Sequence, residues 1–90
     1  MFLDSRVVEV CDKFDTVVAE LLNCTISETH EVLESLSDDL RGIISKTDVE
    51  CYDTLHEVDS LCYEAEHRNN INYSLELSKI KGLYKEETGL

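Results

Sequence analysis

The sequence predicts an all-α fold, a small up-and-down antiparallel bundle of three to four helices that forms a single domain over residues 1–90. The chain has no proline and only three glycines. Its apolar residues recur at alternating spacings of three and four, which is the pattern of amphipathic helices. The expected connections near Cys24, Lys46 and Asn70 are short, so helices that follow one another in the sequence should be antiparallel.

The first helix is expected to carry an unusually broad apolar face. One heptad seam contains Leu3, Val7, Val10, Phe14, Val17 and Leu21. It is extended by Val8, Cys11, Val18, Ala19 and Leu22. At 100° per residue this face covers an arc of roughly 200°. A helix with such a face must be covered from two sides, which predicts a central position or a place in a subunit interface.

Two sequences of the form T-x-x-E predict the starts of the second and third helices. Thr25–Glu28 and Thr47–Glu50 both have the form of a capping box, in which the two side chains satisfy free backbone amides at a helix start. The second helix has one apolar face, made by Ile26, Val32, Leu33, Leu36, Leu40, Ile43 and Ile44. The third has another, made by Cys51, Leu55, Val58, Leu61, Cys62 and Ala65.

A fourth apolar stripe follows, containing Tyr73, Leu77, Ile80 and Tyr84. It is out of register with the stripe of the third helix, and the polar run Arg68-Asn69-Asn70 lies between them with Asn72 as a potential cap. These features favour a break and a separate fourth helix. The alternative is one kinked helix over residues 47–88.

Within the second helix, Gly42 is expected to cost up to about 1 kcal/mol relative to alanine unless a neighbour packs closely there.

The charge of the chain is its strongest functional clue. Twenty acidic residues face eight basic ones, a formal net charge of −12. Residues 1–67 contain 17 acids and four bases, a charge of −13, whereas residues 68–90 contain three acids and four bases, a charge of +1. Such a surface disfavours direct binding to nucleic acid or to an anionic membrane, since both carry the same sign.

The expected location is the cytoplasm. No apolar run reaches the roughly 18 residues needed to span a bilayer, and the first residues lack the charged and apolar regions of a signal peptide. The four cysteines are therefore expected to be reduced. Cys11, Cys51 and Cys62 fall on apolar helical faces, where free cysteine behaves as a small buried hydrophobe.

Rows of carboxylates are the first candidate binding feature. One ridge on the third helix, opposite its apolar stripe, contains Glu50, Asp53, Glu57 and Glu64, and a similar row on the second contains Glu31, Glu34 and Asp38. Any single row is explained as the solvated face of an amphipathic helix. The total of −12 exceeds the net charge of roughly 2 to 8 that keeps a small domain soluble, which suggests an additional role.

The second candidate feature is an arc of rings between that ridge and the core, formed by Tyr52, His56, Tyr63 and His67. They span about 60° of the third helix. Tyrosine is enriched at the centres of interfaces, so these rings are candidates for contacting a partner. In the alternative interpretation they are boundary residues that pack against a neighbouring helix.

Metal binding and catalysis are not expected. Cys51, His56, Cys62 and His67 have a spacing that superficially suggests zinc, but on a regular helix the cysteines and histidines point about 140° apart. His56 with Asp59, or His67 with Glu66 and His30, could in principle bind a metal across helices, but no ligand spacing in the sequence enforces such a site. No phosphate-binding loop, nucleophile elbow or H-E-x-x-H motif is present. We predict no cofactor and no enzymatic activity.

Two functions remain. The first is a small acidic interaction or inhibitor protein that binds a basic, nucleic-acid-binding protein, with carboxylates mimicking nucleic-acid phosphates. Phage proteins that inhibit host defences and immunity proteins of nuclease toxins work in this way, although the analogy rests on charge alone. The second is a structural helical subunit that forms a homodimer through the broad apolar face of the first helix, with acidity serving solubility.

Overall fold

The computed structural model describes residues 4–23, 25–68 and 70–90. Within them the chain forms α1 (Ser5–Leu21), α2 (Ile26–Lys46), α3 (Tyr52–His67) and α4 (Tyr73–Thr88). The predictions made for Leu3, Cys24, Asn69 and the side chain of Ile26 lie outside the described part. The all-α, up-and-down bundle predicted from the sequence is confirmed, with four helices rather than three.

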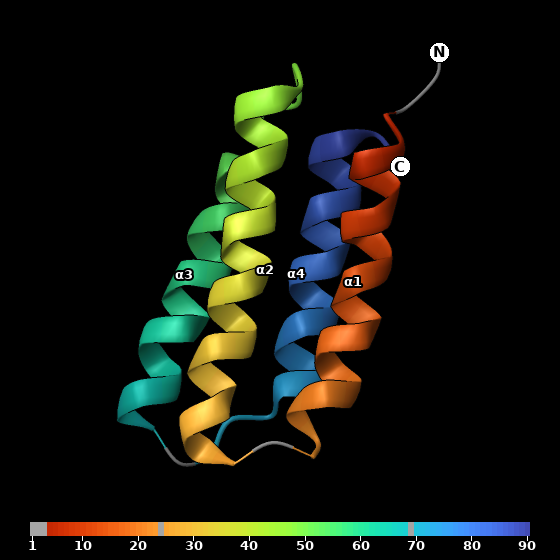
Figure 1. Ribbon diagram of the computed structural model, residues 1–90. Helices are drawn as coiled ribbons and strands as arrows, with labels where there is room; N and C mark the ends of the chain where they lie inside the picture. The colour runs from red at the N-terminus through yellow and green to blue at the C-terminus, as the bar shows by residue number, and fades with distance from the viewer. Residues whose placement is uncertain (1–3, 24, 69) are drawn as a thin grey trace.

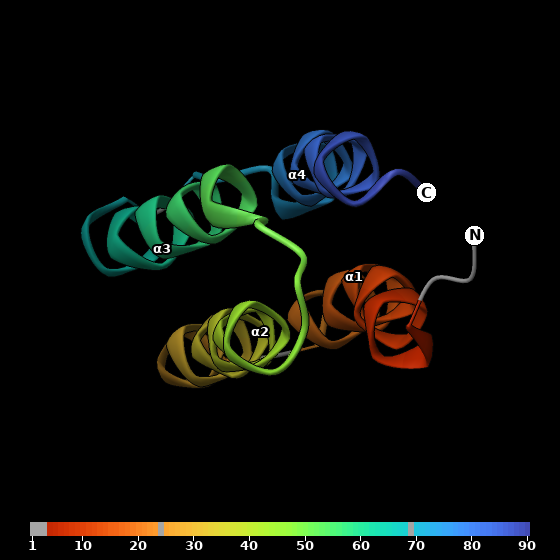
Figure 2. The same ribbon diagram turned by 90° about the horizontal axis from the view of Figure 1, so that it is seen from above.

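The four helices stand at the corners of a square and run antiparallel to their neighbours (Figures 1 and 2). α1 packs on α2 and α4, and α3 packs on the same two helices from the opposite corner. The connections α1–α2 and α3–α4 lie at one end of the bundle, whereas the α2–α3 connection lies at the other. Each helix therefore buries one stripe and leaves its outer side open to a partner.

The core lies between the four buried stripes. Its largest fully buried side chains include Phe14 of α1 and Tyr84 of α4, whose ring centroids are 5.6 Å apart. The Tyr84 hydroxyl donates a 2.8 Å hydrogen bond to the backbone oxygen of Val7. A buried hydroxyl needs such a partner, and this bond also ties the last helix to the first turn of α1.

α1 does not occupy the central position that its broad apolar arc suggested. Its buried residues are those of the seam and Cys11, namely Val7, Val10, Cys11, Phe14, Val17 and Leu21. Of the residues expected to extend this face, Val18 is half-buried and Ala19 is exposed. Val8 remains 42% exposed and Leu22 77% exposed. A square bundle has no central helix, so two neighbours cover only part of a 200° arc.

The first capping box and the fourth helix follow the prediction. The Thr25–Glu28 capping box is present, and the Glu28 carboxylate accepts a 3.3 Å hydrogen bond from the Thr25 backbone amide. The Asn72 side chain caps α4 by accepting from the Leu75 amide at 3.1 Å. α3 ends at His67, so the alternative of one kinked helix over residues 47–88 is wrong.

The second capping box does not form. The Thr47 hydroxyl donates to the Ile43 carbonyl at the end of α2, and α3 begins only at Tyr52. The start of α3 is instead capped from α4. The Glu87 carboxylate accepts hydrogen bonds from the Thr54 amide at 2.6 Å, the Thr54 hydroxyl at 2.5 Å and the Asp53 amide at 3.3 Å. A carboxylate at a helix start satisfies free amides and opposes the positive end of the helix dipole.

Three further observations concern predictions for single residues and for the whole chain. Nothing lies within 4 Å of a Cβ built on Gly42, so no close packing explains this helical glycine. Cys11, Cys51 and Cys62 are buried, free thiols, as their positions on apolar faces predicted. Among the described residues, no helix combines the length and the apolar character that a membrane span requires.

Candidate partner-binding face on α2 and α3

The excess of negative charge is concentrated on one half of the bundle. Residues 25–68, which contain α2 and α3, hold 12 acidic and three basic residues, a net charge of −9. Residues 70–90, which contain α4, hold three of each and are neutral. We call the outward side of α2 and α3, together with the connection between them, the α2–α3 face. It includes all seven carboxylates and all four rings that the sequence suggested as a site.

The ridge predicted on α3 is present but shorter. Asp53, Glu57 and Glu64 lie on the helix, whereas Glu50 precedes it in the connection from α2 and has no part in a cap. Glu57 and Glu64 line a small hollow of about 70 Å³ between α3 and α4, together with Glu76. Arg68 contacts Glu64 at 3.4 Å, while Asp53 and Glu57 have no cationic partner among the described residues.

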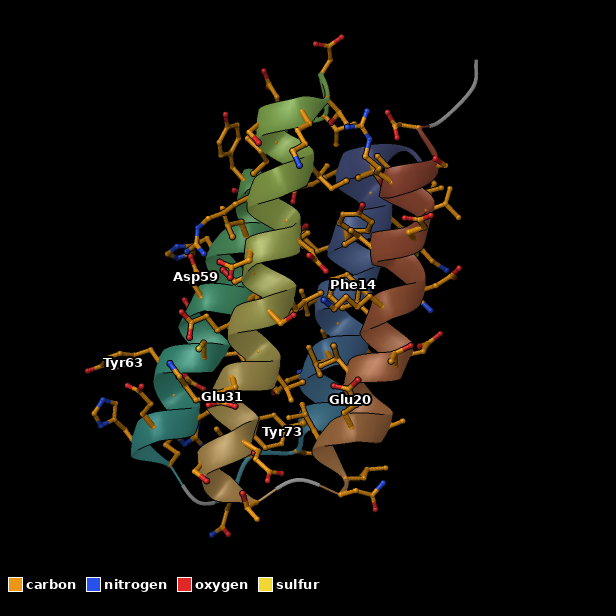
Figure 3. The ribbon with its side chains drawn as sticks, in the orientation of Figure 1. Phe14, Glu20, Glu31, Asp59, Tyr63 and Tyr73 are labelled. Carbon is orange, nitrogen blue, oxygen red and sulfur yellow. The ribbon has the colours of Figure 1, made fainter. Side chains whose placement is uncertain are left out.

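The second acidic row lies along α2. Glu31, Glu34 and Asp38 are all exposed, and Figure 3 shows Glu31 on the outside of the helix. Asp38 pairs with Arg41 at 3.2 Å, and Glu34 lies 3.4 Å from His30. Glu31 has no cationic partner within the described ranges. Glu31 is therefore unpaired among the described residues, whereas Glu34 and Asp38 each have one neighbour on the same helix.

The rings of α3 point outward. Tyr52 is 58% exposed and Tyr63 is 66% exposed, and Tyr63 projects away from the bundle (Figure 3). His56 and His67 are exposed as well, and the His67 ring lies 4.5 Å from that of Tyr63. Both tyrosine side chains are therefore mostly open to solvent, and Tyr63 also lines a hollow beside α2.

A polar groove runs between α2 and α3 beside Tyr63. His30 of α2 lies at its centre, with Nδ1 3.1 Å from Glu66 Oε1 and Nε2 3.4 Å from Glu34 Oε2. Cys62 Sγ lies 3.2 Å from the same Nδ1. These residues line a hollow of about 270 Å³. Two carboxylates from different helices thus approach one imidazole at the surface.

Further along the groove, Arg41 joins the two helices. Its guanidinium donates to both oxygens of Asp59, at 3.2 and 3.1 Å, and to Asp38 at 3.2 Å. The Ser37 hydroxyl, which is buried, donates to Asp59 at 2.5 Å. Asp59 is therefore held by two residues of α2, and both of the hydrogen bonds from Arg41 come from the same guanidinium nitrogen, Nη2.

The pair formed by Cys62 and His30 resembles a thiol and its general base, but its surroundings oppose that role. Burial raises the pKa of the Cys62 thiol, and the negative charges of Glu34, Glu66 and Asp59 raise this pKa further, while Arg41 lowers it. A reactive cysteine requires the opposite, an electropositive site that lowers the thiol pKa. Cys62 therefore stays protonated and fills space in the groove.

No metal site emerges from these contacts. Within residues 4–23, 25–68 and 70–90, no group of three or more histidine, cysteine or acidic side chains is arranged to hold a metal ion.

A different groove, of about 460 Å³, lies between α1 and α4. Lys81 and Lys85 line it, and Lys81 donates to Asp15 at 2.9 Å. That groove carries the opposite charge, so it does not extend the acidic face.

Sequence reasoning missed the groove as a unit. Asp59, Glu66, His30 and Cys62 were considered only for metal binding or for the core, and Arg41 was not considered. Cys62 belongs to the apolar face of α3, and the other four fall between the apolar and acidic faces of their helices, which marks positions beside a neighbouring helix. That signal could have flagged the residues but not their pairing, which depends on how far α2 and α3 are shifted along each other.

We found no match to this chain among protein-family models, curated proteins or solved structures. Its function is therefore argued from the residues of the α2–α3 face.

Proposed function

We propose that this protein is an acidic interaction protein that binds a basic, nucleic-acid-binding protein through the α2–α3 face. Carboxylates of the face take the place of nucleic-acid phosphates against lysine and arginine. The observation that carries the proposal is the exposure of Tyr52 and Tyr63 on α3 between two rows of carboxylates. Exposed tyrosine provides the apolar contact area that a purely solvated face does not need.

The charge of this half supports the same proposal. A net charge of −9 on residues 25–68 creates a field that attracts a basic partner and accelerates their encounter. Glu31, Asp53 and Glu57 have no cationic partner among the described residues, so a partner would not have to break an existing ion pair to reach them. Carboxylates three or four residues apart on a helix are about 5 to 6 Å apart at Cβ, comparable with phosphate spacing along a strand.

The proposal is tested by capture of basic proteins from a cell lysate and by their release. The immobilised protein is expected to retain nucleic-acid-binding proteins at low salt. It should lose them when duplex DNA is added or when salt is raised from about 0.01 to 0.1 M, because the Debye length falls from about 30 to 10 Å. A variant with Glu50, Asp53, Glu57 and Glu64 all replaced by lysine should capture none of them.

The fold of this variant should survive, because Asp53, Glu57 and Glu64 lie opposite the buried stripe of α3, and Glu50 precedes the helix and has no capping role. Circular dichroism and the melting temperature check this. Capture of the same proteins by the wild type and the fourfold variant, with no effect of salt or DNA, would show that the acidic rows are only a solvated surface.

A second proposal is self-association through α1, as the structural alternative predicted. Val8 of α1 and Leu22, which follows that helix, remain exposed, and Leu75 of α4 is exposed as well, so this side of the bundle also presents apolar side chains. Sedimentation equilibrium tests it. A homodimer should weaken when Val8 and Leu22 are both replaced by serine, whereas a monomer at high protein concentration would contradict the proposal.

A further inference from the structure

We propose that the groove beside Tyr63 recognises an arginine side chain of the partner in preference to lysine. The proposal rests on the proposed function and names the chemistry of the contact. Its elements are the exposed Tyr63 ring and the carboxylates of Glu34 and Glu66, which come from the two sides of the groove. The occupant is an arginine-bearing segment of a basic protein, and charge complementarity with the −9 half of the bundle favours it over a neutral or acidic one.

Tyr63 lies at the boundary of two neighbouring hollows. It lines the hollow of about 270 Å³ that contains Glu34 and Glu66, and also an adjacent one of about 420 Å³ that contains His56, Ser60 and Glu64. A side chain that rests on the Tyr63 ring therefore has carboxylates within the same hollow. The ring is accessible, since Tyr63 is 66% exposed.

The carboxylates beside Tyr63 are available to a partner. Among the described residues, neither Glu34 nor Glu66 contacts a lysine or arginine, and both lie beside the imidazole of His30. In the same groove, Arg41 places its own guanidinium on Asp59 through two hydrogen bonds. The spacing of α2 and α3 thus accommodates a guanidinium bound to a carboxylate, and Glu34 and Glu66 line the same hollow as Tyr63.

The preference for arginine follows from geometry. A guanidinium is planar, so it can stack on an aromatic ring while its edge donates to carboxylates. An ammonium group can also lie over a ring, but it is a strongly hydrated point charge that donates in no fixed plane. If net charge alone determined binding, arginine and lysine would bind with equal affinity. The ring and the two carboxylates together favour arginine.

The experiment compares two capped hexapeptides, one of arginine and one of lysine, by fluorescence anisotropy at about 0.01 M salt. The arginine peptide is expected to bind about 3- to 30-fold more tightly, the range of a cation–π contact. Tyr63→Leu should reduce this ratio nearly to one while leaving the lysine peptide almost unaffected. Tyr63→Phe, which keeps the ring, should retain it.

Tyr52→Leu is the matched control, because Tyr52 is exposed on the same helix but lies outside both hollows. It should leave the preference intact. Replacing Glu34 and Glu66 together by glutamine should weaken the arginine peptide more than replacing Glu31 and Asp53, although both double variants lose the same charge.

The outcomes separate the two proposals. Equal affinity of the wild type for both peptides, or a preference that survives Tyr63→Leu, would overturn the arginine site and leave the acidic binding face standing. A loss of preference in Tyr52→Leu that equals the loss in Tyr63→Leu would also overturn it. Failure of the wild type to bind either peptide at low salt would overturn the proposed function itself.

Discussion

The two halves of the bundle use the same helical frame for different surfaces. α4 is a 16-residue helix with equal numbers of acids and bases, and its Tyr84 is completely buried. α3 is also a 16-residue helix, but it carries a large excess of acids and presents Tyr52 and Tyr63 to solvent. Since α4 forms and packs without an acidic surface, the acidity of α2 and α3 is not a requirement of the fold.

The position of the hydrogen-bonded carboxylates supports this distinction. Glu87 of the neutral helix α4 has a structural role at the start of α3. On α2 and α3, several acids also have hydrogen-bonded or ion-paired partners, whereas Glu31, Asp53 and Glu57 have no cationic partner among the described residues. Part of the acidic charge of this half is thus tied into the structure, and part of it faces outward. The following substitutions test whether this comparison holds.

The largest difference is expected between two aromatic residues. Phe14→Ala should destabilise the protein by about 3 to 5 kcal/mol, because it removes a fully buried ring from the contact with Tyr84 and leaves a cavity. Tyr63→Ala should change stability by no more than about 0.5 kcal/mol, since the ring is exposed. Urea denaturation of both variants measures the two values. Similar losses would show that Tyr63 belongs to the folded core rather than to a binding surface.

A smaller difference is expected between two neighbouring glutamates of α4. Glu87→Ala should cost about 1 to 3 kcal/mol, because the Thr54 amide and hydroxyl and the Asp53 amide lose their acceptor. Glu86→Ala, at an exposed position one residue earlier, should cost within about 0.5 kcal/mol. Denaturation at pH 7 compares them. Equal effects would mean that α3 does not depend on the cap supplied by α4.

Tyr84→Phe is expected to cost about 1 kcal/mol at neutral pH, because the Val7 carbonyl loses its hydrogen bond. Burial raises the pKa of Tyr84, and the charges of ionised Cys51 and Cys11 raise it further. A raised pKa in the folded state means that the unfolded chain ionises first. Stability should therefore decline as pH rises above about 10, the ordinary pKa of tyrosine.

Tyr84→Phe should flatten this alkaline decline, and the exposed Tyr52→Phe should not. Melting temperatures between pH 8 and pH 11 give the comparison. An identical decline in the two variants would contradict the assignment to Tyr84.

The smallest effect should be the same in both halves. Gly42 of α2 and Gly82 of α4 have nothing within 4 Å of an added Cβ, so alanine fits at both positions. Each substitution should raise stability by up to about 1 kcal/mol through helix propensity alone. A gain at Gly82 with a loss at Gly42 would show that α2 is constrained in a way that α4 is not.

The sequence predicted those features of the fold that depend on local spacing. The apolar periods located the helices, and the polar run ending at Asn72 separated α3 from α4. The second capping box failed because its motif is local, whereas Glu87 caps α3 from 33 residues away. The broad apolar arc of α1 predicted more buried residues than the structure has. The spacing of apolar residues shows which face of a helix is apolar, but not how many neighbouring helices cover it.

The candidate face was predictable only in part. Helical angles placed Tyr52 and Tyr63 between the core and the acidic ridge, but their exposure depends on α3 having just two neighbours. The contact of His30 with Glu66 and Cys62 joins residues 36 and 32 positions apart, and no motif connects them. Whether the exposed residues bind a partner remains a proposal that rests on their chemistry.

The most direct test of the account compares two charge reversals of equal size. One variant replaces Glu50, Asp53, Glu57 and Glu64 by lysine on the acidic half, and the other replaces Glu9, Asp12, Glu20 and Glu86, which are exposed on α1 and α4. Both change the net charge by the same amount, so they differ only in where the charge lies. The measurement is the affinity of each for the arginine peptide and for the captured basic proteins at about 0.01 M salt.

The account predicts that binding is lost in the first variant and largely kept in the second. Equal losses in the two variants would contradict it, because the partner would then respond to the total charge of the molecule and not to the α2–α3 face.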